Sequence, residues 1–218
     1  MKLKANSSEQ KLRGAYYTPY NLADKIVKLF NFNNVEAILE PSCGDGVFID
    51  ALSENNHLNK KIIAVEIEEK ELNKVRTRYK DFESVSLIGN DFLNFYEKVK
   101  NILSFDLILG NPPYIRYQYL SDGQRNILSE IIEENGMKPN KLINIWVCFL
   151  VACTKLLSKN GKIAFVIPAE LLQVAYAEDL RLFLTNQFSK ITLITFETLI
   201  FPDIEQEILV FIGEKGEH

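Results

Sequence analysis

The stretch FDLILGNPPYIRY, residues 105–117, places an amide and two prolines directly after a run of apolar residues. Phe105 to Leu109 is typical of a buried strand, since such strands are short, apolar and bounded by turn residues. Proline cannot donate a hydrogen bond to a sheet ladder, so the strand must end before Pro112. Gly110 to Pro113 is then either a simple turn, because Asn, Pro and Gly dominate turns, or a polar site at the mouth of a strand. The rest of the chain decides between the two.

The bulk composition is that of an ordinary globular protein. The chain has 218 residues, of which 47% are hydrophobic and 25% are charged, and this fits one domain or one large domain with a small appendage. No apolar run reaches the roughly 20 residues that a membrane span needs. The N-terminus also lacks the apolar core of a secretory signal. We therefore predict a protein that is neither membrane-spanning nor secreted.

The cysteines and histidines are few and widely spaced. The cysteines are Cys43, Cys148 and Cys153, and the histidines are His57 and His218. No pair has the C-x-x-C spacing, which argues against a zinc site, and we predict no metal. An odd, sparse set of cysteines fits a reducing cytoplasm, which is the location that we expect.

The charge balance is acidic, with a net charge of −4 and a pI near 5.4. A free-standing nucleic-acid binder usually carries a basic face, so this balance argues against one, although it leaves room for a local basic patch. Two basic clusters are present, and they consist of Lys2, Lys4, Lys11 and Arg13, and of Lys70, Lys74, Arg76, Arg78 and Lys80. We interpret the second cluster as the solvated side of a helix.

Helix-like and strand-like segments alternate along the chain, which predicts a parallel sheet with helices on both faces. The predicted helices cover residues 21–32, 47–56, 70–80, 143–157 and 178–188. The predicted strands cover residues 37–41, 61–69, 84–91, 105–111, 161–168, 190–197 and 207–213. A short connection joins the last two strands, so we expect this pair to be antiparallel. Residues 118–142 contain a helical piece but have no clear place in the sheet, and we interpret them as a mobile insertion.

A glycine turn follows the first predicted strand, and an acidic residue ends the second. Gly44 and Gly46 permit a tight turn and a close approach of a ligand to the backbone. Glu66 can accept both hydroxyls of a ribose, as acidic residues do at this place in dinucleotide folds. The turn stops at two glycines and is not G-x-G-x-x-G. This pattern argues against a pyrophosphate cofactor and favours a nucleoside without phosphates.

The third and fourth strands also end in polar residues. Asp91 can accept a hydrogen bond from an exocyclic amine, Phe92 can stack on a ring, and Asn111 ends the fourth strand. Ligands of open α/β sheets bind beyond the carboxyl ends of the strands. Polar groups at four successive strand ends, in register with a glycine loop, therefore predict a site rather than four turns.

These motifs, in this order, resemble those of S-adenosylmethionine-dependent adenine-N6 DNA methyltransferases of restriction-modification systems. The matching segments, which lie between Arg13 and Ile212, are RGAYYTP, ILEPSCGDGVF, VEIEEKEL, GNDF, GNPPY, NIWVCF and LIFPDIEQEILVFI. The resemblance implies an α/β fold of the Rossmann-like class I methyltransferase type. Such a fold has a mostly parallel seven-stranded sheet and an antiparallel last strand. Residues 1–218 would then form a single catalytic domain.

The resemblance implies a cofactor, S-adenosyl-L-methionine, and a set of residues that bind it. In this set Thr18, Glu40 and Gly44 lie beside the methionine end, and Pro41 and Gly46 belong to the same cofactor-binding set. Glu66 holds the ribose, Ile67 flanks the adenine, Asp91 binds the adenine amine, and Phe92 and Phe149 stack on the ring.

The catalytic residues implied are Asn111, Pro112, Tyr114 and Phe201. The amine of adenine is a poor nucleophile because its lone pair is delocalised into the ring. Two acceptors, the side-chain oxygen of Asn111 and the backbone carbonyl of Pro112, would favour a tetrahedral nitrogen. The prolines hold these acceptors in place before the reaction. Tyr114 and Phe201 would clamp an adenine that has been flipped out of the duplex.

Several residues keep a second interpretation. Phe201 is either this clamp or a core phenylalanine, and we interpret Trp146 as core packing. Arg116, Tyr117 and Tyr119 follow the catalytic loop, and the sequence does not decide whether they contact the nucleic-acid backbone.

Members of the family normally continue into a target-recognition domain, whereas this sequence ends at FIGEKGEH. We therefore expect that domain to be absent and DNA recognition to need a separate specificity partner. Three alternatives stay open: an RNA adenine methyltransferase, a protein glutamine methyltransferase, which also uses N-P-P-Y, and a cofactor-binding subunit without catalysis. The motifs RGAYYTP and FPDIEQEILVFI favour the DNA enzyme over the glutamine enzyme, and the intact N-P-P-Y argues against the silent subunit.

Overall fold

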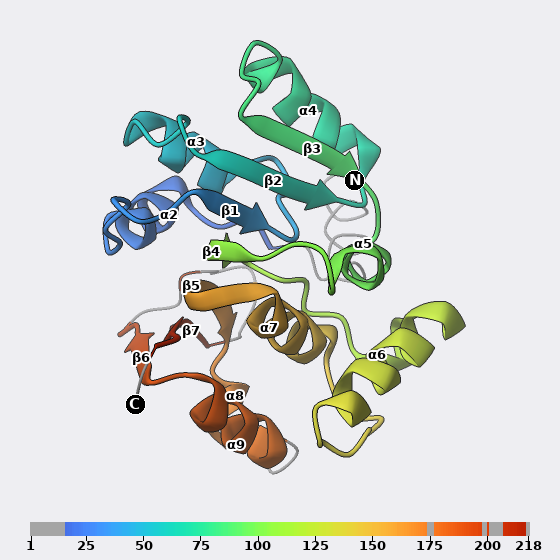
Figure 1. Cartoon of the computed structure of the whole chain (residues 1–218). Helices are drawn as coiled ribbons and strands as arrows, with labels where there is room; N and C mark the ends of the chain where they lie inside the picture. The colour runs from blue at the N-terminus through green and yellow to red at the C-terminus, as the bar shows by residue number, and fades with distance from the viewer. Residues whose placement is uncertain (1–15, 174–176, 198–199, 201–206, 217–218) are drawn as a thin grey trace.

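The structure is a computed structural model that describes residues 16–173, 177–197, 200 and 207–216. The strands are β1 (Ala37–Glu40), β2 (Lys61–Glu66), β3 (Val85–Gly89), β4 (Phe105–Gly110), β5 (Leu157–Pro168), β6 (Lys190–Thr195) and β7 (Ile208–Glu214). The helices are α2 (Tyr20–Val27), α3 (Val47–Glu54), α4 (Glu69–Tyr79), α5 (Phe92–Val99), η1 (Tyr117–Tyr119), α6 (Asp122–Glu134), α7 (Ile145–Leu156), α8 (Glu170–Gln173) and α9 (Glu178–Gln187). Strands and helices thus alternate, as the sequence predicts (Figure 1).

The described strands form one seven-stranded sheet in the order β3-β2-β1-β4-β5-β7-β6. The strands from β3 to β5 pair in parallel, and β7 lies antiparallel to both β5 and β6. The mostly parallel sheet with an antiparallel last strand is therefore confirmed. The chain builds outward from β1 to β3 and then returns to place β4 on the other side of β1. Such a reversal of strand order is where open α/β sheets bind ligands.

Alternate residues of β2 face different helices, and this places a helical layer on each side of the sheet. Ala64 packs with Ile49 of α3 and with Leu72 and Val75 of α4. Its neighbour Val65 belongs to the larger core on the other face, where α5 and α7 lie (Figure 1). Because successive side chains of a strand point to opposite faces, both faces of β2 are covered.

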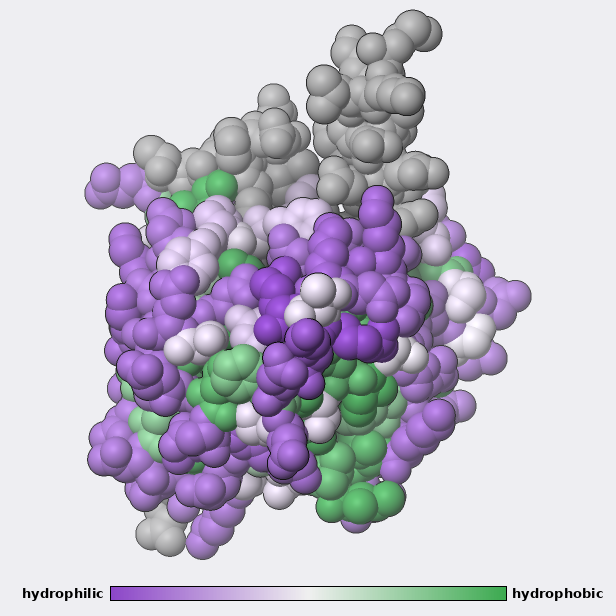
Figure 2. Space-filling model, turned by 90° about the horizontal axis from the view of Figure 1, so that it is seen from above, coloured by the Kyte–Doolittle hydropathy of each residue, from purple (hydrophilic) through white to green (hydrophobic). Residues whose placement is uncertain are grey.

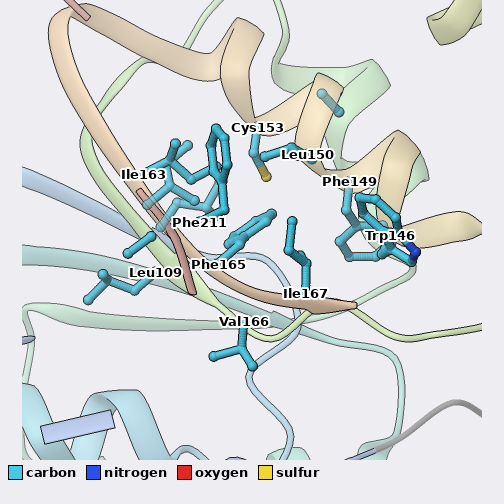
Figure 3. Close-up of a cluster of buried hydrophobic side chains, with 14 of the residues drawn as sticks. Leu109, Trp146, Phe149, Leu150, Cys153, Ile163, Phe165, Val166, Ile167 and Phe211 are labelled. Carbon is cyan, nitrogen blue, oxygen red and sulfur yellow. The ribbon is translucent and has the colours of Figure 1, made fainter. Parts of the chain in front are cut away.

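Helix α7 forms the centre of the larger core. Every residue of this helix except Lys155 is buried, which confirms the prediction of a helix that packs deep against the sheet. Figure 3 shows Phe165 and Ile167 of β5 pointing toward α7, while Val166 between them points to the opposite face. Trp146 is fully buried in this cluster, in agreement with its interpretation as core packing.

The basic cluster of residues 70–80 lies on the exposed side of α4. Three of its members pair with carboxylates: Lys74 with Glu71 at 2.6 Å, Arg76 with Glu69 at 2.9 Å and Arg78 with Asp50 at 3.1 Å. Figure 2 views the molecule from the end where α4 and β3 lie, and most of the surface there is hydrophilic. The interpretation of this cluster as the solvated side of a helix is confirmed.

Strand β5 and helix α5 are among the elements that differ from the prediction. Strand β5 begins at Leu157, four residues before the predicted start, because Leu157 pairs with Phe105 across a register shift in the ladder. Ser158 adds a hydrogen bond of 2.8 Å to Asp106 in this part of the sheet. Helix α5 was not predicted. It begins directly after Asp91, whose side chain caps it by accepting from the Leu93 amide at 2.8 Å.

The stretch 118–142 contains the expected helix, now α6, which a capping box of Ser121 and Gln124 closes at its N-terminus. Its buried side chains Leu128, Ile131 and Ile132 join the larger core. The mobility of this stretch stays a prediction. Within the described part of the chain, no helix is both long enough and apolar enough to cross a bilayer.

Candidate active site

The carboxyl ends of β1 to β4 open into one cavity of about 350 Å³, a size within the usual range of small-molecule sites. The arrowheads of β1, β2 and β3 point to the same edge of the sheet (Figure 1). Glu40, Glu66, Asp91 and Asn111, one from each strand end, all line the cavity. The predicted meeting of four polar strand ends is therefore present in the structure.

The glycine turn after β1 has left-handed backbone at both glycines. Gly44 has a φ of 53° and Gly46 a φ of 87°, a region that strongly favours glycine. Gly44 lines the cavity, whereas Gly46 does not. A Cβ on Gly46 would lie 2.9 Å from the side chains of Val75 and Arg78 of α4. The first glycine is thus placed for a ligand, and the second allows α4 to pack close to the turn.

Glu66, at the end of β2, joins the glycine turn to the loop that follows its own strand. Its Oε2 accepts from the Gly44 amide at 2.7 Å, and its Oε1 accepts from the Glu68 amide at 2.8 Å. Burial raises the pKa of this carboxyl, although the backbone amides of Glu68, Gly44 and Ile67 oppose the shift. The two hydrogen bonds fix the orientation of a carboxylate that faces the cavity.

Glu40 is the most deeply buried charged residue of the cavity, with 3% of its surface exposed. Its Oε2 finds no hydrogen-bond partner among the described residues. Burial raises the pKa of this carboxyl well above its ordinary value, and the carboxylates of Glu66, Asp50 and Asp45 raise it further. A buried carboxyl with an unpartnered oxygen is costly unless a ligand completes it, and a cation satisfies both its charge and its acceptor.

The raised pKa of Glu40 predicts a pH-dependent cost to the stability of the unliganded protein. The native state favours the protonated carboxyl, so stability is lost as the pH rises from the unfolded pKa, near 4.5, through the native pKa. Glu40→Gln carries no such titration. In urea unfolding followed at several pH values, its free energy of unfolding relative to the wild type should increase steadily above about pH 4.5.

Asp106→Asn serves as a control of opposite sign. Hydrogen bonds from Glu36, Ser158 and Ala37 outweigh burial and lower the pKa of Asp106. The wild type therefore gains stability as the pH rises from the native pKa of Asp106 to its unfolded pKa, near 3.8. This variant should fall further behind it over that range and stay behind by a constant amount at higher pH. A gap between Glu40→Gln and the wild type that does not change with pH would contradict the interpretation of Glu40.

Apolar side chains line the cavity beyond Glu66. Ile67 exposes 61% of its surface at the edge of the cavity, which is unusual for a large aliphatic residue next to a buried strand. The ring centroids of Phe92 and Phe149 lie 4.6 Å apart with an angle of 38° between the ring planes, and both residues line the cavity. This arrangement offers apolar contacts to a planar ring.

Asp91 is held by two hydrogen bonds next to these rings. Besides capping α5, it accepts from Nε2 of Gln124 through Oδ2 at 2.6 Å. Gln124 comes from α6 and also lines the cavity. The segment after the N-P-P-Y motif thus contacts the strand end that was expected to bind the cofactor's amine.

The side chain of Asn111 is oriented by the backbone of Tyr16. Its Nδ2 donates to the Tyr16 carbonyl at 2.6 Å. Its Oδ1 is buried and has no hydrogen-bond partner among the described residues. Ser42 fixes the backbone by donating to the Asn111 carbonyl at 3.2 Å. The side-chain amide therefore has a fixed orientation, and none of the described residues donates a hydrogen bond to its oxygen.

Of the other predicted catalytic residues, Pro112 and Tyr114 do not line the cavity. Pro112 is buried, and Pro113 lines the cavity instead. Tyr114 is only 8% exposed, and its hydroxyl donates to the Val166 carbonyl at 3.1 Å. Its ring centroid lies 5.4 Å from that of Tyr16. Phe201 falls outside the described residues.

Of the predicted cofactor residues, the cavity is lined by Thr18, Glu40, Pro41, Gly44, Glu66, Ile67, Asp91, Phe92 and Phe149.

Sequence reasoning missed several residues of the site. Tyr16 acts through its carbonyl, and a backbone group leaves no signal in the sequence. The ring of Tyr17 lies against the glycine turn, 3.5 Å from where a Cβ of Gly44 would stand. Gln124 follows Ser121 by three residues, and this capping-box spacing predicts a helix start but not a contact with Asp91.

Comparison with known proteins assigns the chain to a family. The family model described as Eco57I restriction-modification methylase matches residues 47–201. The chain belongs to this family. The matched range begins directly after Gly46 and includes Glu66, Asp91 and Asn111.

One similar protein is the type II methyltransferase M.AccI of Acinetobacter calcoaceticus, which is 31% identical to this chain over 192 residues. The alignment covers 86% of the chain and 34% of M.AccI. The chain spans about a third of the length of M.AccI and of two other type II methyltransferases that it matches, M.HincII and M.HindII of Haemophilus influenzae.

Two solved structures share the fold at low identity. A structure described as a class I S-adenosylmethionine-dependent methyltransferase of Listeria monocytogenes superposes with a TM-score of 0.74 at 13% identity, over 94% of this chain and 62% of that one. The DrdV–DNA complex superposes with a TM-score of 0.73 at 16% identity, over 96% of this chain and 27% of that one. The class I methyltransferase fold expected from the sequence is confirmed.

Proposed function

We propose that this chain carries the catalytic site of a DNA methyltransferase that transfers a methyl group from S-adenosyl-L-methionine to the N6 amine of adenine. The observation that carries the proposal is the buried Oδ1 of Asn111, which has no hydrogen-bond partner among the described residues, while Nδ2 donates to the Tyr16 carbonyl. An uncommitted acceptor at a strand mouth suits a substrate with a hydrogen to donate. An exocyclic amine is such a group.

The charge of the cavity supports the proposed cofactor. Five carboxylates line the cavity, and no Lys, Arg or His does so among the described residues; the five are Glu40, Asp45, Glu66, Glu68 and Asp91. S-adenosylmethionine carries a sulfonium and an ammonium group, so this lining attracts it, whereas it repels the pyrophosphate of a dinucleotide. Glu66 would accept from the ribose hydroxyls. Ile67, Phe92 and Phe149 would contact the adenine ring.

The chain's own residues would make the target amine reactive. When bound, the cofactor supplies an electrophilic methyl group. Asn111 Oδ1 and the Pro112 carbonyl would accept the two hydrogens of the amine and favour a tetrahedral nitrogen, so that its lone pair is no longer delocalised into the ring. The nitrogen would then take the methyl group, leaving S-adenosylhomocysteine, and one amine proton would pass to solvent. Preorganised acceptors of this kind act without rearranging during the reaction.

The target base would reach these acceptors by leaving the duplex, since its amine is inaccessible inside the stack. We propose Tyr114 as the platform on which it stacks and Phe201 as the second side of the clamp. The bond from Tyr114 to Val166 supports a platform role, because it fixes one edge of the ring.

We further propose that recognition of a DNA sequence depends on a separate target-recognition domain or subunit. The support is the net charge of −4, since duplex affinity comes largely from basic groups that neutralise phosphates.

The three described cysteines are free and buried, and this fits the reducing cytoplasm in which we place the protein.

The test is incubation with S-adenosylmethionine labelled in its methyl group and with separate samples of DNA, RNA and glutamine-containing protein. Labelled DNA is digested to nucleosides and separated by chromatography. Label in N6-methyladenine supports the proposal, and label in N4-methylcytosine overturns the adenine specificity. Label only in RNA or in protein glutamine favours one of the other methyltransferases. If no substrate is labelled even when the separate target-recognition domain or subunit is present, the result favours a cofactor-binding subunit without catalysis.

A further inference from the structure

Gln124 makes two kinds of contact from the first turn of α6. Its Oε1 accepts from the Ser121 backbone amide at 3.1 Å and lies 3.2 Å from the Ser121 hydroxyl, which completes the capping box. Its Nε2 donates to Oδ2 of Asp91 at 2.6 Å, across a sequence separation of 33 residues. The capping box needs only the oxygen of this side chain. The amide nitrogen is therefore available for a different task inside the cavity.

Asp91 is fixed at both of its oxygens by these neighbours. Oδ1 accepts from the Leu93 amide at 2.8 Å, and Oδ2 accepts from Gln124. A carboxylate offers about four lone-pair positions, so two hydrogen bonds leave capacity for another donor. Asp91 lines the cavity beside Phe92 and Phe149, which offer apolar contacts to a ring. The remaining capacity is thus close to where a purine would lie.

We propose that Gln124 is a positioning residue that orients Asp91 to accept from the 6-amino group of the cofactor's purine. The inference rests on the proposed function, which supplies an adenine nucleoside as the ligand. A carboxylate held at two points loses less freedom when it binds the amine. Both of its oxygens already accept hydrogen bonds, so the side chain presents acceptors to the ligand and disfavours a purine that carries an oxygen at the same position.

The contact with Asp91 is not needed to hold α6 on the protein. Leu128, Ile131 and Ile132 bury the inner face of the helix. Arg125 donates to the carbonyls of Tyr117 at 3.2 Å and of Gln118 at 2.9 Å. Loss of the Gln124 amide should therefore leave the helix docked, and its effect on binding can be measured in a folded protein.

Three variants separate the capping role of Gln124 from its positioning role. Gln124→Ala removes both contacts. Ser121→Ala removes the hydroxyl half of the cap but leaves the Gln124 side chain on Asp91 and on the backbone amide of residue 121. Gln124→Glu keeps a good capping residue at this position but replaces the amide donor with a second carboxylate next to Asp91. Thermal unfolding checks that each variant is folded.

The probes are S-adenosylhomocysteine and S-inosylhomocysteine, which differ at position 6 of the purine, and calorimetry measures their affinities. The wild type should prefer the amino compound. Gln124→Ala and Gln124→Glu should each bind S-adenosylhomocysteine about tenfold more weakly, because one hydrogen bond to a charged group contributes about this much. Both variants should also discriminate less between the two compounds. Ser121→Ala should match the wild type in both respects.

The possible outcomes separate this inference from the function on which it rests. If the wild type binds neither compound, the proposed cofactor is wrong and the role of Gln124 is overturned with it. If the wild type binds and discriminates but the Gln124 variants keep its preference, only the positioning role is overturned. Equal losses in Ser121→Ala and Gln124→Ala would show that Gln124 acts through the helix cap, which also overturns the positioning role.

Discussion

Replacing Asn111 with alanine should reduce methyl transfer by roughly 10²–10³-fold, as does removal of one preorganised hydrogen-bond partner of a transition state. The side-chain oxygen that would accept from the amine disappears, and no other described side chain takes its place. Glu66 and Asp91, which we propose to bind the cofactor, stay intact. Affinity for S-adenosylhomocysteine, measured by calorimetry, should therefore change less than twofold, while single-turnover transfer to DNA falls.

Asn111→Asp is the matched variant for this prediction. It keeps an oxygen at Oδ1 but places a second oxygen, instead of Nδ2, against the Tyr16 carbonyl, so the side chain loses the bond that orients it. We expect transfer to be strongly reduced here too. Thermal unfolding should show that both variants are folded. Transfer at the normal rate in Asn111→Ala would show that the acceptor role is wrong.

Replacing Glu66 with alanine should weaken cofactor binding at least tenfold, which is a loss of about 1.4 kcal/mol or more in the free energy of binding. The change removes the proposed acceptor for the ribose hydroxyls. It also leaves the amides of Gly44 and Glu68 without the carboxylate that now joins them. Both effects act on the cofactor site, so transfer at saturating cofactor should fall less than affinity does.

Glu69→Ala is the control for the loss of a negative charge near this loop. Glu69 begins α4 and pairs with Arg76 on the surface, and it does not line the cavity. Its removal should leave affinity within about twofold, because exposed ion pairs contribute little. Unchanged affinity in Glu66→Ala would remove Glu66 from the binding site, and tighter binding of NAD than of S-adenosylmethionine would contradict the proposed cofactor.

The sheet and the strand ends could be predicted because their signals are local. Short apolar runs, each followed by a polar residue or a glycine, mark β1 to β4, and topology alone then brings Glu40, Glu66, Asp91 and Asn111 to one edge. Helix α5 carried such a signal as well. Asp91 is a good capping residue, and the apolar residues that follow it have helical spacing. It was missed because Asp91 was interpreted only as the end of a strand.

The contacts that orient the site could not be predicted, because they depend on how distant segments pack. The bond between Gln124 and Asp91 exists only once α6 has docked near α5. The distinction between Gly44 and Gly46 depends on α4, whose Val75 and Arg78 approach the second glycine. Spacing identifies two glycines in a turn but not which of them faces the ligand.

If Asn111 has the proposed acceptor role, its bond to the Tyr16 carbonyl separates folding of the sheet from catalytic competence. The bond joins positions 95 residues apart, and Tyr16 belongs to none of the strands that build the sheet. During refolding, the spectroscopic signal of the sheet can therefore recover before the segment around Tyr16 docks and sets the amide. Activity should lag behind structure, and a protease that cuts between this segment and α2 should leave a folded protein with a misoriented amide.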